Sequence, residues 1–306
     1  MPTETEQPYG YNVRCIGVVN GIVCLQWDNK EIGFWNPATR DFKLIEYYHL
    51  NLPRRAISVT LQLIGFGFDI VSNDFKVVGV NRWWGPGSNK INEKHCRVYS
   101  VTANTWKNIN APPAIFSTTS SLRNAFLKGV YYWPTKVFSE CGHKHRDMIV
   151  SFNFIIEVFE IFELPKDACL AFNNGWWTDW TIQLYMESIA LIISKENSEA
   201  GENIVDIWIA IKFDDDSRVP LSWEHLFTIP LTPTFSTIWV YGSRNHVKLI
   251  IQIHDENLEA TYYCSLYNPS TGMFKKLGIT IDTCLGYVES LFPLSKKPLK
   301  DGPHLS

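Results

Sequence analysis

The chain alternates short apolar runs with polar, turn-forming residues over almost its whole length, and few segments have the 3.6-residue period of an amphipathic helix. The apolar runs are rich in Val, Ile, Tyr, Phe and Trp, and they end at Asn, Gly, Pro or Asp. Many short strands of this kind predict an all-β domain. We expect strands at 22–27, 31–35, 75–80, 97–101, 130–133, 148–154, 189–194, 204–212, 249–253 and 261–267.

One sequence unit recurs along the chain: an apolar strand, a polar turn, an aromatic residue and a second short strand. In four copies a small polar residue lies six positions before the aromatic residue. The pairs are Asn36 and Phe42, Ser100 and Trp106, Asn153 and Phe159, and Asn268 and Phe274. A looser copy at 205–231 has Trp223 as its aromatic residue. Successive aromatic residues are 64, 53, 64 and 51 residues apart, somewhat more than the roughly 50 residues of a kelch-type blade.

Each unit is typical of the outer hairpin of a four-stranded blade, and we expect its aromatic side chain to pack between neighbouring blades. A single blade cannot bury both of its faces, so the units must stack in a ring. The sequence therefore predicts a kelch-like β-propeller of about five to six blades, with a β-sandwich as the alternative. We expect the run at 287–292 to close the ring against 15–19.

Composition narrows the classes of partner and compartment. A net charge of −3 with 19% charged residues disfavours nucleic acid as the partner. No apolar run approaches the roughly 18 residues of a membrane helix, so no membrane partner is expected. The seven cysteines include no Cys-x-x-Cys pair, which disfavours a zinc or redox site and fits a reducing compartment. We therefore expect a cytoplasmic or nuclear location, no cofactor, and flexible ends at 1–10 and 295–306 around one domain at 11–294.

Several segments together resemble the F-box-associated domain of plant F-box proteins. Residues 20–25 are similar to that family's CNGLLCL segment, and residues 35–42 are similar to its WNPATREF signature. Residues 65–78 resemble its GFGYD and YKVV strand pair, 97–106 its EVYSLKTNSW hairpin, and 127–133 its LNGALYWL segment. The ordered series covers roughly residues 10 to 294. Within the family, the long loops and the C-terminal half are most similar to S-locus F-box and related F-box-like proteins.

The resemblance implies a protein-binding module that selects targets for an SCF-type (cullin-RING) E3 ubiquitin ligase, in which other subunits carry out catalysis. The likeness to S-locus proteins implies a pistil S-ribonuclease, typically basic, as a target. No F-box is visible ahead of Tyr11, so a Skp-type adaptor and a cullin are expected as partners only if an F-box is supplied upstream. The alternatives are an F-box-less decoy that binds the same target, and a propeller enzyme or lectin.

Tryptophan clusters are the first candidates for partner contact. Trp83 and Trp84 precede a Gly-Pro-Gly turn, and Trp176, Trp177 and Trp180 follow Asn-Asn-Gly. Exposed Trp is costly unless it docks something, and Trp is enriched in binding hot spots. The alternative for both clusters is packing between blades.

Two polar segments complete the candidate set. His143 and His145 follow Cys141 at a spacing that metal ligands use, but no second cluster would complete a zinc site, so an exposed loop is expected. Asp214, Asp215 and Asp216 have carboxylates that bind cations in other proteins, yet a solvated hairpin tip between Phe213 and Trp223 fits them better. We treat both segments as candidate partner contacts, and the acidic one suits a basic partner.

Overall fold

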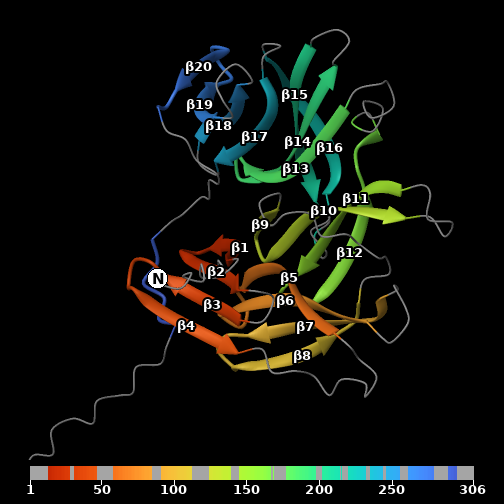
Figure 1. The fold of residues 1–306 in the computed structure, drawn as a ribbon, viewed down its shortest axis with the longest axis vertical. Coiled ribbons are helices and arrows are strands. Elements are labelled where there is room, and N and C mark those ends of the chain that lie inside the picture. Colours follow the sequence, from red (N-terminus) through yellow and green to blue (C-terminus); the bar gives the residue numbers. More distant parts are fainter. Residues whose placement is uncertain are drawn as a thin grey trace, which may run out of the picture.

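The computed structural model of the chain describes residues 13–27, 31–46, 58–84, 91–111, 124–138, 145–166, 168, 177–197, 202–213, 215, 220–231, 235–243, 246–255, 261–278 and 289–294. These residues form twenty strands in five antiparallel four-stranded sheets. The sheets are arranged as the blades of a β-propeller (Figure 1). The predicted all-β propeller is confirmed, with five blades among the described residues.

Each of the five described sheets consists of four strands that follow one another in the chain. The first blade contains β1 (Val13–Val19), β2 (Ile22–Trp27), β3 (Glu31–Asn36) and β4 (Asp41–Glu46). The second contains β5 (Ser58–Asp69), β6 (Asp74–Trp84), β7 (Ile91–Ser100) and β8 (Thr105–Ile109). The third contains β9 (Ala125–Leu127), β10 (Val130–Phe138), β11 (His145–Asn153) and β12 (Val158–Glu163). The fourth contains β13 (Trp177–Tyr185), β14 (Ser188–Asn197), β15 (Glu202–Phe213) and β16 (Pro220–Leu231). The fifth contains β17 (Phe235–Ser243), β18 (His246–Asp255), β19 (Thr261–Asn268) and β20 (Met273–Lys276).

The six-residue spacing of the repeat has a local cause in the turn between the outer two strands. In the first blade, the Asn36 Oδ1 atom accepts hydrogen bonds from the backbone N–H groups of Ala38 and Thr39, an Asx-turn that replaces ladder bonds. The turn ends at Arg40, whose φ of 61° is left-handed. Asn153 and Glu157 repeat this arrangement in the third blade. In the four blades with this spacing, the aromatic residue two positions later is the second residue of the outermost strand.

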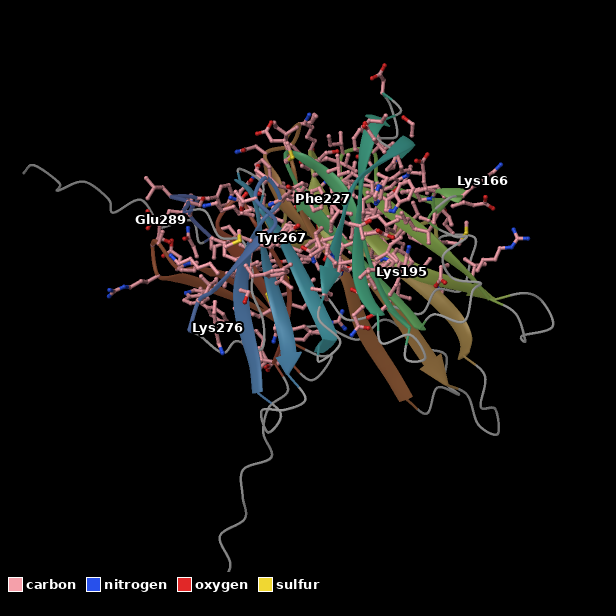
Figure 2. All side chains as sticks on the ribbon, turned by 90° about the horizontal axis from the view of Figure 1, so that it is seen from above. Lys166, Lys195, Phe227, Tyr267, Lys276 and Glu289 are labelled. Carbon is pink, nitrogen blue, oxygen red and sulfur yellow. The ribbon has the colours of Figure 1, made fainter. Side chains whose placement is uncertain are left out.

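Apolar clusters join successive blades. Four such clusters of described residues connect the first blade to the second, the second to the third, and so on to the fifth. Trp106 packs against the cluster shared with the first blade, and Phe159 packs against the one shared with the second. Phe227 of the fourth blade meets Tyr267 of the fifth, with ring centroids 6.4 Å apart (Figure 2). Packing of the repeat aromatics between blades is confirmed at Trp106 and Phe159.

The C-terminal segment 289–294, here called the clasp, returns from the fifth blade to the first two. It lies beside β3 and β4, away from β20 (Figure 1). The Asn36 Nδ2 group donates hydrogen bonds to the backbone carbonyls of Ser290 and Phe292, both at 2.9 Å. The Phe292 ring packs 4.8 Å from Phe75, and Leu294 is buried in the cluster between the first two blades. This cluster also contains Ile16 and Val19, within the expected 15–19 segment, but the clasp is not a strand paired with β1.

Candidate partner-binding site

The antiparallel strand order places two kinds of connection at opposite ends of the propeller. At one end, which we call the hairpin end, lie the short turns after the first and third strand of each blade. At the other, the long-loop end, lie the loops after the second strand and the connections from blade to blade. The long-loop end therefore contains the longer and more varied connections, the part of a scaffold where binding residues are most often found.

Four of the ten candidate residues lie at the long-loop end by their positions in the strands. Trp83 and Trp84 are the last two residues of β6. His145 is the first residue of β11 and pairs with Phe138, the last of β10. Trp177 is the first residue of β13. Residues from three consecutive blades are thus brought to one end, an arrangement that the sequence alone did not predict.

The other candidates are distributed differently. Trp180 is only 7% exposed and belongs to the cluster between the third and fourth blades, so its side chain packs between blades and is not a partner contact. Asp215 is exposed in the turn after β15, which belongs to the hairpin end. His143, Trp176, Asp214 and Asp216 lie outside the described residues. Asp215 and the strand-end tryptophans Trp83, Trp84 and Trp177 therefore lie at opposite ends of the propeller.

The hairpin end of the second and third blades is held by a buried ion network. The Lys76 ammonium donates to Asp69 Oδ2 at 2.8 Å, to Glu157 Oε1 at 3.1 Å and to the Phe154 carbonyl at 3.1 Å. Burial by itself would raise the pKa of each carboxyl. Hydrogen bonds from Lys76, with others from Ser72 to Asp69 and from Lys107 to Glu157, outweigh burial and hold both pKa values below their usual range. The ammonium has three partners, so we assign it to joining two blades rather than to binding a ligand.

A second polar cluster, on the fourth blade, superficially resembles a catalytic triad. Thr228 Oγ1 donates to Asp206 Oδ1 at 2.5 Å and lies 3.2 Å from His225 Nε2. The same Nε2 atom is 3.4 Å from Asp206 Oδ1. A triad needs both ring nitrogens, one toward the hydroxyl and one toward the carboxylate. Lys195 also forms an ion pair with this carboxylate. The cluster therefore lacks relay geometry and ties three neighbouring strands together.

The first blade carries an exposed aromatic surface that the sequence reasoning missed. Trp35 and Phe42 are directly opposite each other on β3 and β4, and they are 43% and 49% exposed. The residues equivalent to Trp35 in three other blades are Tyr99, Phe152 and Tyr267, which pair in the same way with the repeat aromatic. They are 2%, 0% and 6% exposed. The expectation that Phe42 packs between blades is corrected: it lies on the side of the first blade that faces away from the second.

Glycine at position 33 shapes this surface. A Cβ atom there would lie 2.5 Å from Cζ3 of Trp27 and 2.8 Å from Cζ of Phe42, so only glycine leaves room for both rings. These rings meet edge to face with centroids 6.1 Å apart. We call Trp27, Gly33, Trp35, Phe42 and Leu44 the seam face. The alternation of Gly33 and Trp35 with Phe42 close behind was the available sequence signal.

In the part of the chain that the structure describes, no group of three or more His, Cys, Asp or Glu side chains is placed to hold a metal ion. Within the same residues, no helix has the length and apolar character needed to cross a membrane.

A model of the F-box associated beta propeller domain matches residues 2–294. The chain belongs to this family.

Among its relatives in Arabidopsis thaliana, the putative F-box/kelch-repeat protein At1g12170 is 24% identical, with 93% of this chain and 74% of that protein covered. F-box/kelch-repeat protein At3g23880 is 22% identical, with 82% and 61% covered. Putative F-box protein At1g70380 is 24% identical, with 63% and 48% covered. The chain thus spans between about half and three quarters of the length of these relatives. The WD40 domain of SCAP from fission yeast aligns over 90% of this chain and 91% of its own, at 7% identity and a TM-score of 0.31, which is too low to support an argument.

Proposed function

We propose that this chain is the substrate-recognition part of an SCF-type E3 ubiquitin ligase and that it binds its protein target with the long-loop end. One observation carries the proposal: strand ends from three consecutive blades lie together at the long-loop end, and they include Trp83, Trp84 and Trp177. Membership of the F-box associated propeller family and the F-box relatives support it.

In this role the chain contributes binding and positioning, while ubiquitin transfer belongs to other subunits. The Asp206 cluster lacks the geometry of a proton relay, which supports a structural role for that cluster. The Skp-type adaptor and cullin associate through an F-box joined to this domain. The buried thiol of Cys24, in a chain without a Cys-x-x-Cys pair, supports work in a reducing compartment, the cytoplasm or the nucleus.

The test is affinity purification of the tagged chain from plant cells, with quantitative mass spectrometry. A long-loop variant, Trp83→Ser with Trp177→Ser, is compared with a matched hairpin-end variant, Ile70→Ser with Val71→Ser. Ile70 and Val71 are 74% and 77% exposed, so their replacement leaves the core intact. We expect one set of proteins to be bound by the wild type and the hairpin-end variant and lost by the long-loop variant. Equal retention by both variants would overturn the assignment of the site.

A finer proposal concerns the target. Recognition of a basic pistil S-ribonuclease rests on the resemblance to S-locus proteins, and the chain's net charge of −3 favours the approach of a basic protein. Binding of purified S-ribonuclease should weaken with salt and be lost in the long-loop variant Trp83→Ser with Trp177→Ser. Salt-independent binding, or none at low salt, would reject this target.

A further inference from the structure

The seam face has the chemistry of an inter-blade interface, yet it is exposed. Its central pair, Trp35 and Phe42, repeats the cross-strand aromatic pair that other blades bury against their neighbour. Trp27 and Leu44 extend it, and Leu44 is 48% exposed. Large apolar surfaces of this kind on a folded domain mark interaction sites.

The other blades show what covers such a pair. The Phe152 and Phe159 pair of the third blade packs in a cluster with Val78, Val80 and Val98 of the second. In the fifth blade, Tyr267 packs with Val205, Ile207 and Ile229 of the fourth. In both cases the cover is a strand face with β-branched side chains at alternate positions, the period that places them on one side of a sheet. The contacts between neighbouring blades therefore show which kind of surface would cover the seam face.

We propose that the seam face is a second docking site, which takes a β-strand segment of a partner protein with Ile, Val or Leu at alternate positions. Glu31 is exposed on the same face of β3, two residues before Gly33. A Lys or Arg at one end of the docked segment would meet this carboxylate. The site is separate from the long-loop end and does not depend on the function proposed for that end.

Two other occupants fit the observations less well. The fifth blade could supply a cover only through the face that points away from the fourth. That face carries Gln252 and Cys264, which are 3% and 0% exposed and are therefore already covered. A second copy of the chain, related by a twofold axis, would oppose two aromatic faces that both carry Glu31, in place of the aliphatic cover seen in the other blades.

The experiment places a photo-crosslinking phenylalanine analogue at position 35 of the purified full chain, which is irradiated in plant extract. Crosslinked peptides are then sequenced. We expect peptides of another protein with aliphatic residues at alternate positions and a basic residue at one end. Phe42→Ser should lower the yield by at least about tenfold, the loss expected when a hot-spot aromatic is truncated. Crosslinks only within the chain, only between two copies, or to segments without this pattern would overturn the proposal.

A second measurement separates binding from folding. The crosslinked segment is synthesised with a fluorescent label, and its binding to the chain is followed by anisotropy. Glu31→Lys and Phe42→Ser should each weaken binding, whereas Phe274→Ser, the equivalent aromatic position in the fifth blade at 40% exposure, should not. The long-loop variant Trp83→Ser with Trp177→Ser should also bind the segment normally. Loss of binding in that variant, or none in Glu31→Lys, would contradict a separate site.

Discussion

Replacing Asn36 by Asp would separate the two roles of this side chain. Its Oδ1 atom accepts the turn hydrogen bonds, and its Nδ2 group holds the clasp through two carbonyls. An aspartate keeps the first role, because Asp69 accepts the same kind of bond from Val71 in the second blade. It loses the second, because a carboxylate oxygen cannot donate. Asn36→Asp is therefore predicted to release the clasp while leaving the turn intact.

The magnitude follows from the contacts. Two hydrogen bonds at 2.9 Å are lost, at about 1 kcal/mol each, and a charged oxygen then faces two carbonyls in a site where Asn36 is 0% exposed, which adds about 1–3 kcal/mol. We expect the free energy of unfolding to fall by about 3–5 kcal/mol. The matched control is Asn268→Asp: Asn268 accepts the same turn bond in the fifth blade, from the Ser270 N–H, at a partly exposed position. Its replacement should change stability by less than about 0.5 kcal/mol.

The assay is urea denaturation at neutral pH together with hydrogen exchange of segment 289–294. Asn36→Asp should lower the denaturation midpoint and remove protection from the clasp, whereas Asn268→Asp should do neither. Equal stability of the two variants, with unchanged protection at 289–294, would refute the role assigned to Asn36.

Three further predictions concern the ion network and one strained turn. Lys76→Met should lower the free energy of unfolding by about 3–5 kcal/mol, because it leaves the buried Asp69 carboxylate without its cation and removes one of the two cations of Glu157. Lys107→Met, at a side chain 71% exposed, should cost less than about 1 kcal/mol. Similar costs of the two variants in urea denaturation would contradict this. The pKa of Asp69 is lowered in the folded state. Asp69 therefore contributes to the free energy of unfolding above its unfolded pKa, and this contribution is lost as pH falls through the folded pKa, below about pH 4. Denaturation across a pH series should show this loss in the wild type and much less of it in Lys76→Met. Glu187→Gly should raise the free energy of unfolding by about 0.5–1 kcal/mol, and the urea midpoint with it, because Glu187 has a left-handed φ of 61°. A lower midpoint would show that the Glu187 side chain contributes more than the strain costs.

Local signals in the sequence were enough to predict the blades. The spacing between Asn36 and Phe42 reflects a turn whose geometry is set by nearby residues, so it recurs wherever the turn recurs. Strands with continuous apolar runs were also found. The strand β13 (Trp177–Tyr185) was missed because Asp179 and Thr181 interrupt its apolar run, while Trp180 and Ile182 face a neighbouring blade.

Features that depend on ring closure were not predictable in this way. Phe42 has the same local sequence context as Phe159, yet one is half exposed and the other packs between blades. The second blade covers the side of the third blade that carries Phe159, whereas no described blade covers the side of the first blade that carries Phe42. The clasp depends on contacts between Asn36 and Phe292, 256 residues apart, which no local pattern encodes. The gathering of Trp83 and Trp177 at one end likewise follows from strand direction in the assembled fold.

The central claim, that this chain selects proteins for ubiquitination, is tested most directly by the half-life of a captured target in plant cells. The chain is expressed with an F-box joined upstream, and the target's decay is followed after protein synthesis is blocked. We predict a shortened half-life that is restored by proteasome inhibition and by the long-loop variant Trp83→Ser with Trp177→Ser. An unchanged half-life for a target that is bound, with the Skp-type adaptor present in the same complex, would contradict the claim.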